Sequence, residues 1–278
     1  MARPVRIEYS GAYYFISSKA APGETVFKDT KDRQEFLSIL QDVVKRMHWE
    51  VFAYNLMPDS YQLFIKTPKP NLSRGMRQLN GVYTQRYNAK YETTGNIFHG
   101  RFKAILVEAK HSFEDVLKYV LLMPLLKRKA RKLDKWKWSS YQATMGITEA
   151  PQWLKVDEVL SHFGKQPKRA RAALQKALEN TDKDFDLMVQ VKAQILLGSD
   201  AFINKWKKQL DTGKIMDRAR QRKSKKVKPL TDFGKRFKNI KVAMVKAYET
   251  GNYTLDQIGT HFGVHYSTVS RTVKKAGL

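Results

Sequence analysis

The sequence predicts an α+β protein: a ferredoxin-like β-α-β-β-α-β domain, then a helical region, then a C-terminal three-helix helix-turn-helix domain. Strand and helix patterns alternate over the first hundred or so residues. Residues 112–210 have mainly helical patterns, and residues 236–278 break into short helical segments around a glycine turn. With 278 residues, of which 42% are hydrophobic, the chain is long enough for more than one packed core.

Four strands and two helices make up the predicted first domain. Apolar runs of strand length stand at residues 13–16, 49–57, 61–67 and 102–108, and Pro58-Asp59 marks a hairpin turn between the second and third. One-sided apolar spacing predicts helices at 30–47 and 71–91, the latter beginning near an Asn or Ser cap. A sheet of this kind carries its helices on one face, so we expect the other face to be open for a ligand.

Helices also account for most of the middle of the chain. Ser112 is the predicted cap of a helix that stops at Pro124, and further helices are expected at 156–163, 169–180 and 185–197. Residues 205–241 hold 15 Lys or Arg against three acids, with few apolar residues, which predicts a flexible basic linker or arm. The expected organisation is a domain at 1–145, a helical extension at 146–210, a linker at 211–235 and the helix-turn-helix at 236–278.

The strongest compositional signal is charge. The chain has 52 Lys and Arg against 26 Asp and Glu, a net charge of +26, and this excess favours a polyanionic partner. Lipid is disfavoured because the sequence has no apolar run of membrane-spanning length and no lipidation motif. Cysteine is absent, which excludes disulfides and thiolate metal sites. We expect a DNA partner, no membrane and a cytoplasmic location.

The terminal segment has the pattern of a helix-turn-helix. Helices are expected at 237–249, 254–262 and 265–274, with Gly263 in the tight turn. Because the last helix of this motif enters the major groove, we expect DNA contacts from His265, Tyr266, Ser267, Thr268, Arg271 and Lys274. Arg271 is the best candidate to contact guanine, since its guanidinium group can donate two hydrogen bonds to the O6 and N7 acceptors. A small helical bundle with a polar surface is the alternative.

The third strand carries two polar residues on one side. Ser60 and Gln62 are two positions apart, so their side chains point to the same face of the strand, and Tyr61 points to the opposite face. The second predicted helix carries Tyr83 and Tyr87, which we expect to pack nearby. By residue type alone, Tyr83 is more often a core or surface aromatic than a nucleophile.

Several stretches together carry a family resemblance. They are residues 1–9 (MARPVRIEY), 53–58 (AYNLMP), 71–81 (NLSRGMRQLNG), 98–104 (FHGRFKA), 138–141 (WSSY) and 197–199 (LGS), followed by the terminal helix-turn-helix. In content and order they resemble the REP-associated tyrosine transposases, relatives of the single-strand HUH transposases with one catalytic tyrosine. The resemblance covers nearly the whole chain and is most specific up to residue 141.

This resemblance implies metal-dependent DNA cleavage, but the residues expected to bind the metal ion differ in this sequence. In the family, two histidines separated by one hydrophobic residue hold a divalent ion, and a helix tyrosine attacks the scissile phosphate. Tyr83 matches the nucleophile position, but the histidine positions hold Ser60 and Gln62, and a further one holds Phe15. Neither a hydroxyl nor an amide replaces imidazole for a transition-type ion. We therefore expect no metal site, no cofactor and no metal-dependent cleavage.

The predicted function is DNA binding by a protein derived from such a transposase. Arg74, Arg77, Arg101 and Lys103 are expected to contact the DNA backbone. The expected DNA is a hairpin or single-stranded repeat together with duplex, and the sequence leaves homodimerisation open.

Two other functions stay open. An active transposase or nickase would use Tyr83 with Mg²⁺ or Mn²⁺ on an atypical site, with His99 or His111 as further ligands. A repurposed transcription or replication regulator would act through the helix-turn-helix. RNA binding is disfavoured, because the central strands lack a clear pair of aromatic residues.

Overall fold

The computed structural model describes residues 6–212, 228–237 and 239–277. These residues form two compact units, an N-terminal one that ends with the helix at Asp200–Asp211 and a C-terminal one that begins at residue 228. Residues 213–227, which hold most of the predicted basic linker, lie outside the described ranges. Among the described residues, no helix combines the length and apolar character needed to cross a membrane.

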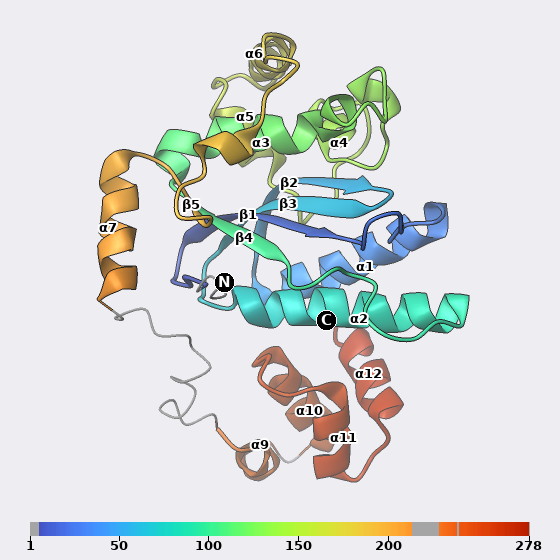
Figure 1. The fold of residues 1–278 in the computed structure, drawn as a ribbon. Helices are drawn as coiled ribbons and strands as arrows, with labels where there is room; N and C mark the ends of the chain where they lie inside the picture. The colour runs from blue at the N-terminus through green and yellow to red at the C-terminus, as the bar shows by residue number, and fades with distance from the viewer. Residues whose placement is uncertain (1–5, 213–227, 238, 278) are drawn as a thin grey trace. The chain divides into compact units, whose positions relative to one another are not determined.

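A five-stranded sheet forms the centre of the N-terminal unit (Figure 1). Its strands are β1 (Ala12–Lys19), β2 (Glu50–Met57), β3 (Ser60–Thr67), β4 (Lys103–Val107) and β5 (Leu196–Leu197), in the order β2-β3-β1-β4-β5. The first four strands pair with one another in antiparallel fashion, as in a ferredoxin-like sheet, and β5 is parallel to β4 at the edge. The predicted α+β fold class and β-α-β-β-α-β order are therefore confirmed. β1 is longer than predicted, because all eight of its residues pair with β3.

Helices α1 (Thr30–Met47) and α2 (Leu72–Tyr91) lie together on one face of this sheet (Figure 1). α1 begins with a capping box formed by Asp29 and Asp32. The sequence predicts an Asn or Ser cap at the start of α2, but the side chain of Asn71, the residue before the helix, makes no capping hydrogen bond. The Asn71 Oδ1 instead accepts a hydrogen bond from Trp49 Nε1 at 2.9 Å, so it ties the start of α2 to the residue just before β2.

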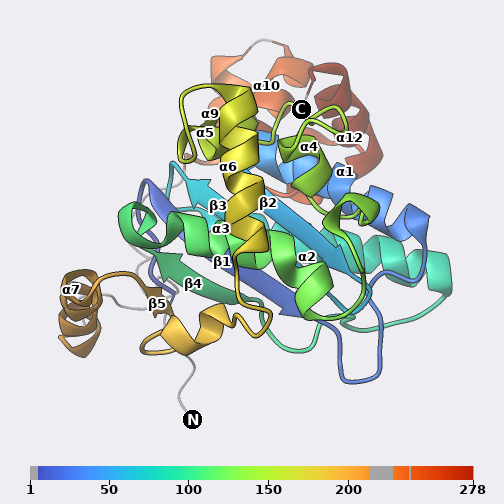
Figure 2. The same ribbon diagram turned by 90° about the horizontal axis from the view of Figure 1, so that it is seen from above.

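The other face of the sheet is covered, so the prediction of an open face is wrong. α3 (Ala109–Leu126) packs on it, and Figure 2 shows this helix crossing the sheet. The ring of Phe113 lies 5.2 Å from that of Phe52 and 4.8 Å from that of Phe64. Leaving side chains of this size in water would cost about 1.5–3 kcal/mol each, and a covering helix removes that cost.

α3 differs from the predicted helix at both ends. Ser112 is not its cap: the helix starts at Ala109, and the Ser112 N–H already donates to the Glu108 carbonyl at 2.9 Å. The helix also continues past Pro124 to Leu126. A proline in the last turn removes one intrahelical hydrogen bond, which the packing of the rest of α3 outweighs.

The predicted helical extension folds onto the first domain. It contains α5 (Val156–Ser161), α6 (Pro167–Glu179), α7 (Asp200–Asp211) and a 3₁₀ turn at Leu187–Gln190. The stretch just before it contains α4 (Tyr141–Thr144) and a 3₁₀ turn at Leu133–Lys135. Val159, Leu160, Leu174 and Leu178 join the same core as α3. The predicted helix at 185–197 is wrong, because this stretch ends in β5, whose backbone hydrogen-bonds the edge of β4. α7 likewise occupies the first part of the predicted basic linker or arm.

The C-terminal unit contains four helices in its described residues: α9 (Leu230–Arg236), α10 (Ile240–Glu249), α11 (Leu255–Phe262) and α12 (Tyr266–Lys275). The last three are those predicted, and they close a core of Met244, Ala247, Ile258, Val269 and Val273. Gly263 ends α11 at a φ of 69°, a conformation that favours glycine. α9 replaces the end of the predicted linker, because Leu230 and Phe233 pack on this core.

Candidate nucleic-acid interface

Ser60 and Gln62 stand on the sheet face that α3 covers. Gln62 lies opposite Ser17 of β1 and Asn55 of β2. It is two residues from Phe64, which packs against α3, and strand alternation places both on the same side. The Gln62 Nε2 lies 3.4 Å from the Ser60 hydroxyl oxygen, so the two side chains share one face as predicted.

A chain of hydrogen bonds occupies these side chains. Trp136 Nε1 donates to Asn55 Oδ1 at 3.0 Å, and Asn55 Nδ2 donates to Gln62 Oε1 at 3.1 Å. Gln62 Nε2 donates to Ser60 Oγ, whose hydroxyl donates to the Asp59 carboxylate at 3.0 Å. Asn55 and Gln62 are buried, so each amide depends on its neighbours for its hydrogen bonds. The two expected ligand positions are thus part of a structural polar chain.

Tyr83 lies on the opposite side of the sheet from Gln62. Its ring is buried 5.5 Å from that of Phe27 and 5.2 Å from that of Phe36, and its hydroxyl donates to the Val26 carbonyl. Burial raises the pKa of Tyr83 well above its usual value. The expectation that Tyr83 packs near Ser60 and Gln62 is wrong, because α2 covers one face of the sheet while those two side chains point to the other.

A different tyrosine, which the sequence did not single out, shares the face of Gln62. Tyr119 of α3 packs its ring 5.6 Å from Phe15, and its hydroxyl donates to Asp186 at 3.4 Å. Burial, with the nearby Asp186 carboxylate, raises the pKa of Tyr119 to about 12. The only sequence signal for its orientation is its place on the apolar side of α3, together with Val116 and Val120.

The two histidines considered as further metal ligands, His99 and His111, do not lie in a group of metal-binding side chains among the described residues. His99 is exposed in the loop before β4. His111 is near the start of α3, with its Nδ1 3.2 Å from Ser112 Oγ. Across the described ranges, no three His, Cys, Asp or Glu side chains are grouped in a way that would hold a metal ion.

A basic groove of about 530 Å³ runs between α2 and the loop that leads into β4. Two of the predicted DNA-contacting residues, Arg77 and Arg101, line it, and both are exposed. Its full lining is Arg6, Ser73, Met76, Arg77, Asn80, Gly81, Thr84, Gly95, Asn96, Phe98, Gly100, Arg101 and Phe102. This lining includes three arginines and no acid, so the groove attracts anions.

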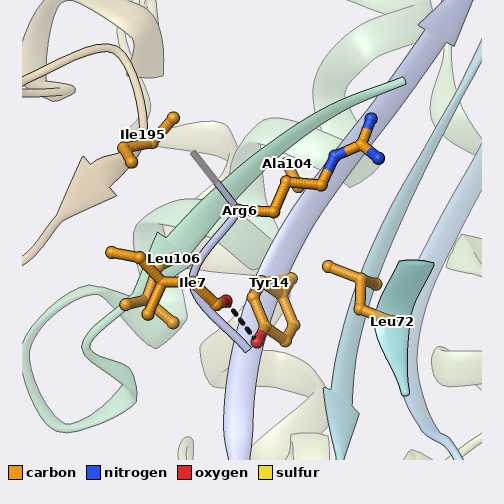
Figure 3. Close-up of a pocket in the computed structure, with 7 residues that line it drawn as sticks. All are labelled: Arg6, Ile7, Tyr14, Leu72, Ala104, Leu106 and Ile195. Atoms are coloured by element: carbon orange, nitrogen blue, oxygen red, sulfur yellow. Dashed lines mark hydrogen bonds between the residues drawn. The ribbon is translucent and has the colours of Figure 1, made fainter. Parts of the chain in front are cut away.

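Arg6 is the groove residue that the sequence did not single out. Its guanidinium carbon lies 3.7 Å from the centre of the Phe102 ring, and its Nη2 donates to the Phe102 carbonyl at 3.2 Å. Figure 3 shows Arg6 extending past Ala104, away from Ile7, whose carbonyl accepts a hydrogen bond from the Tyr14 hydroxyl at 2.8 Å. The anchored segment at Ile7 therefore fixes where Arg6 enters the groove.

Two other predicted contact residues lie outside the groove. Arg74 is half-buried, one helical turn before Arg77. Lys103 is exposed on β4, and its Nζ lies 3.3 Å from Met188 Sδ. The structure therefore brings together two of the four cations predicted for this domain.

The C-terminal unit presents its predicted residues around the start of α12. His265 is the N-cap, and its Nδ1 accepts a hydrogen bond from the Ser267 N–H at 3.4 Å. Tyr266 is 51% exposed, and Arg271 is exposed one turn after Ser267, whose carbonyl accepts from its Nε. Lys274 is also exposed, whereas Thr268 is half-buried. The exposed part of this set lies on one helix with a basic last turn.

Comparison with known proteins identifies the N-terminal part of the chain. Residues 19–121, from the end of β1 into α3, match the family described as “Transposase IS200 like”. The matched stretch contains Ser60, Gln62 and Tyr83, together with Arg77 and Arg101 of the groove. The resemblance inferred from the sequence is thereby confirmed for this stretch.

Two solved structures described as transposases are also similar to this chain. One is described as a REP-associated tyrosine transposase bound to a REP hairpin; it is 14% identical, with a TM-score of 0.47, over 54% of this chain and 89% of that one. Another is a transposase candidate from Deinococcus radiodurans R1, 19% identical with a TM-score of 0.30, over 43% of this chain and 95% of that one. No protein of curated function matches the sequence.

Proposed function

We propose that this protein is a DNA-binding derivative of a REP-associated tyrosine transposase that holds DNA without cutting it. The observation that carries the proposal is the polar chain at Ser60 and Gln62, in a domain of the IS200-like transposase family. Cleavage in such a family depends on stabilising negative charge at the scissile phosphate, and a metal ion contributes several kcal/mol to that.

The polar chain argues against metal binding at these positions. Gln62 Oε1 accepts from Asn55 Nδ2, and Ser60 Oγ accepts from Gln62 Nε2. An ion that took the Gln62 oxygen would leave the Asn55 amide without its acceptor, at a cost of about 1–3 kcal/mol for a buried polar group. The uncharged oxygens of Ser60 and Gln62 would also bind a transition-type ion less tightly than two imidazoles would. Metal-dependent cleavage at this site is therefore disfavoured for two reasons, the lost hydrogen bond of Asn55 and the weak ligands.

DNA would be held by two surfaces of different character. The basic groove of Arg6, Arg77 and Arg101 suits the phosphates of hairpin or single-stranded repeat DNA. The exposed residues at the start of α12 suit duplex DNA, because a helix of this kind reads base edges from its N-terminal end. A protein that binds in this way would be found on the bacterial nucleoid, in the cytoplasm.

A nicking assay on a hairpin oligonucleotide tests the proposal. The natural protein, with Mg²⁺ or Mn²⁺, should shift the hairpin in a gel yet form no covalent protein–DNA adduct. The Ser60→His/Gln62→His double variant serves as the attempted restoration of a metal site, read first by Mn²⁺ binding. Tyr83→Phe and Tyr119→Phe assign any adduct to one hydroxyl. A metal-dependent adduct with the natural protein would overturn the proposal in favour of an active transposase.

A further inference from the structure

A second basic surface, separate from the groove, follows α3. Residues 127–137 hold seven Lys or Arg and one acid, and we name this segment the basic loop. All seven cations are exposed: Lys127, Arg128, Lys129, Arg131, Lys132, Lys135 and Lys137. Among the described residues, only Lys135 of this set has an acidic partner, since its Nζ lies 3.8 Å from Asp134 Oδ2. The loop therefore has a large positive charge that the N-terminal unit leaves uncompensated.

The backbone of the basic loop is held by the domain beneath it. The carbonyl of Pro124, in the last turn of α3, accepts hydrogen bonds from the N–H groups of Lys129 and Ala130 at 2.8 and 3.0 Å. Further along, Leu133 is buried and packs into the core that α3 shares with the sheet. The charges are therefore presented from a fixed backbone, and a ligand does not have to order the segment when it binds.

The two tryptophans near the end of the loop are engaged by the protein. Trp136 Nε1 donates to Asn55 Oδ1, and the guanidinium carbon of Arg33 lies 5.4 Å from the centre of the Trp138 ring. Both tryptophans are half-buried. Unpaired bases bind by stacking on free aromatic faces, so the loop suits phosphates better than bases.

Crowding of like charges favours a polyanion as the ligand. Consecutive residues are about 3.8 Å apart along the chain, well within the Debye length of about 8 Å, so the cations of the loop repel one another. Duplex DNA has one negative charge for about each 1.7 Å of its axis, and cations that lie on it neutralise phosphates and release counterions. The backbone of a duplex therefore matches the loop in charge and in spacing.

The basic loop and the groove lie on different parts of the sheet. The loop leads to Trp138, whose carbonyl accepts from the Leu56 N–H at 2.8 Å, so it reaches β2 at one margin. The groove is bounded by the loop into β4, and β3 and β1 lie between β2 and β4. The other wall of the groove is α2, whereas the basic loop continues α3 on the opposite face (Figure 1). Since DNA is stiff over about 150 base pairs, one short stem does not bend around the sheet to fill both surfaces.

We propose that the basic loop binds the phosphate backbone of a duplex DNA segment other than the DNA in the groove. The N-terminal unit would then hold two DNA segments at once, one on each side of its sheet. Binding to the loop would be independent of sequence, because cations that contact phosphates do not read base edges. The inference rests on the proposed DNA-binding function and adds to it a further surface and a second DNA segment.

Fluorescence anisotropy of the full-length protein with a short labelled duplex of arbitrary sequence, titrated at several salt concentrations, tests this inference. Lys129→Gln/Arg131→Gln removes two charges of the basic loop at exposed positions outside any helix or strand. Lys207→Gln/Lys208→Gln removes two exposed charges from α7, which follows β5 at the opposite margin of the sheet, and is the matched control. Each titration is run without hairpin and with one equivalent of unlabelled hairpin per protein.

The natural protein and the α7 variant should share one log–log slope of duplex affinity against salt. The slope of the loop variant should be shallower by about 1 to 2, since each phosphate contact contributes about 0.9. The difference between the loop variant and the natural protein should persist with the hairpin present, because the hairpin occupies the groove.

Equal slopes for the natural protein and the loop variant overturn the inference, and so does an equal loss of slope in the α7 variant. A difference that disappears when the hairpin is added also overturns it, because the loop then holds the hairpin itself. Failure of the proposed function has a different signature: the natural protein then does not bind the hairpin, whereas the duplex titration without hairpin still reports on the loop.

Discussion

Two glycines of α2 give opposite predictions for the same substitution. Gly75 faces the sheet, and a Cβ built there would lie 2.1, 2.6 and 2.9 Å from three ring atoms of Trp49. The Trp49 ring is buried and hydrogen-bonded to Asn71. Gly81 is exposed on the same helix, with nothing within 4 Å of a Cβ. Alanine at each position therefore separates close packing from helix propensity.

The magnitudes follow from these contacts. Alanine is favoured over glycine in a helix by about 0.8–1.0 kcal/mol, so Gly81→Ala should raise the free energy of unfolding by up to about 1 kcal/mol. Gly75→Ala has the same gain, but the Trp49 ring must move. Overpacking costs about 1–3 kcal/mol and the lost Trp49–Asn71 hydrogen bond about 1 kcal/mol. Gly75→Ala should therefore lower the free energy of unfolding by about 1–3 kcal/mol.

Urea unfolding followed by tryptophan fluorescence measures both effects. All five tryptophans lie between residues 49 and 206, so the signal reports on the N-terminal unit alone. If Gly75→Ala proves as stable as the natural protein, the Trp49 ring does not exclude a side chain at position 75. If Gly81→Ala is destabilised, the space around Gly81 is not open.

Three further predictions concern DNA binding and pH. Arg271→Ala should weaken duplex binding by about 1–3 kcal/mol and relax sequence preference at one position, as read by competition gel shifts; unchanged duplex binding would remove α12 as the recognition helix. DNA affinity should fall with salt, with a log–log slope of about −0.9 per neutralised phosphate on duplex, and deletion of residues 214–228 should flatten it; an identical slope would mean that this segment does not touch DNA. Burial raises the pKa of Tyr54 and of Tyr119 to about 12 from about 10, so both favour the protonated, folded state. The free energy of unfolding should be at its full value below pH 10 and fall as pH rises toward 12, and Tyr54→Phe should reduce that fall; a flat profile would contradict the burial argument.

The sequence by itself determined the elements and the local orientation of side chains. Alternation along β3 was enough to put Ser60 and Gln62 on one face, because neighbouring strand residues point to opposite sides. Apolar spacing was enough to predict α1, α2 and the last three helices, and a glycine marked the turn between α11 and α12. The basic residues of α2 and of the loop before β4 were likewise recognisable as candidate DNA contacts.

Only the tertiary structure decided which helix covers which face of the sheet. The sequence predicts an open face, but α3 packs there, and this brings Tyr119 to the side of Gln62 and leaves Tyr83 on the other side. The groove also depends on contacts between distant segments, since Arg6 joins Arg101 through the ring of Phe102. Periodicity reports which side of its own element a residue faces. The partner on that side is set by how the chain crosses between elements, and local spacing carries no record of that crossing.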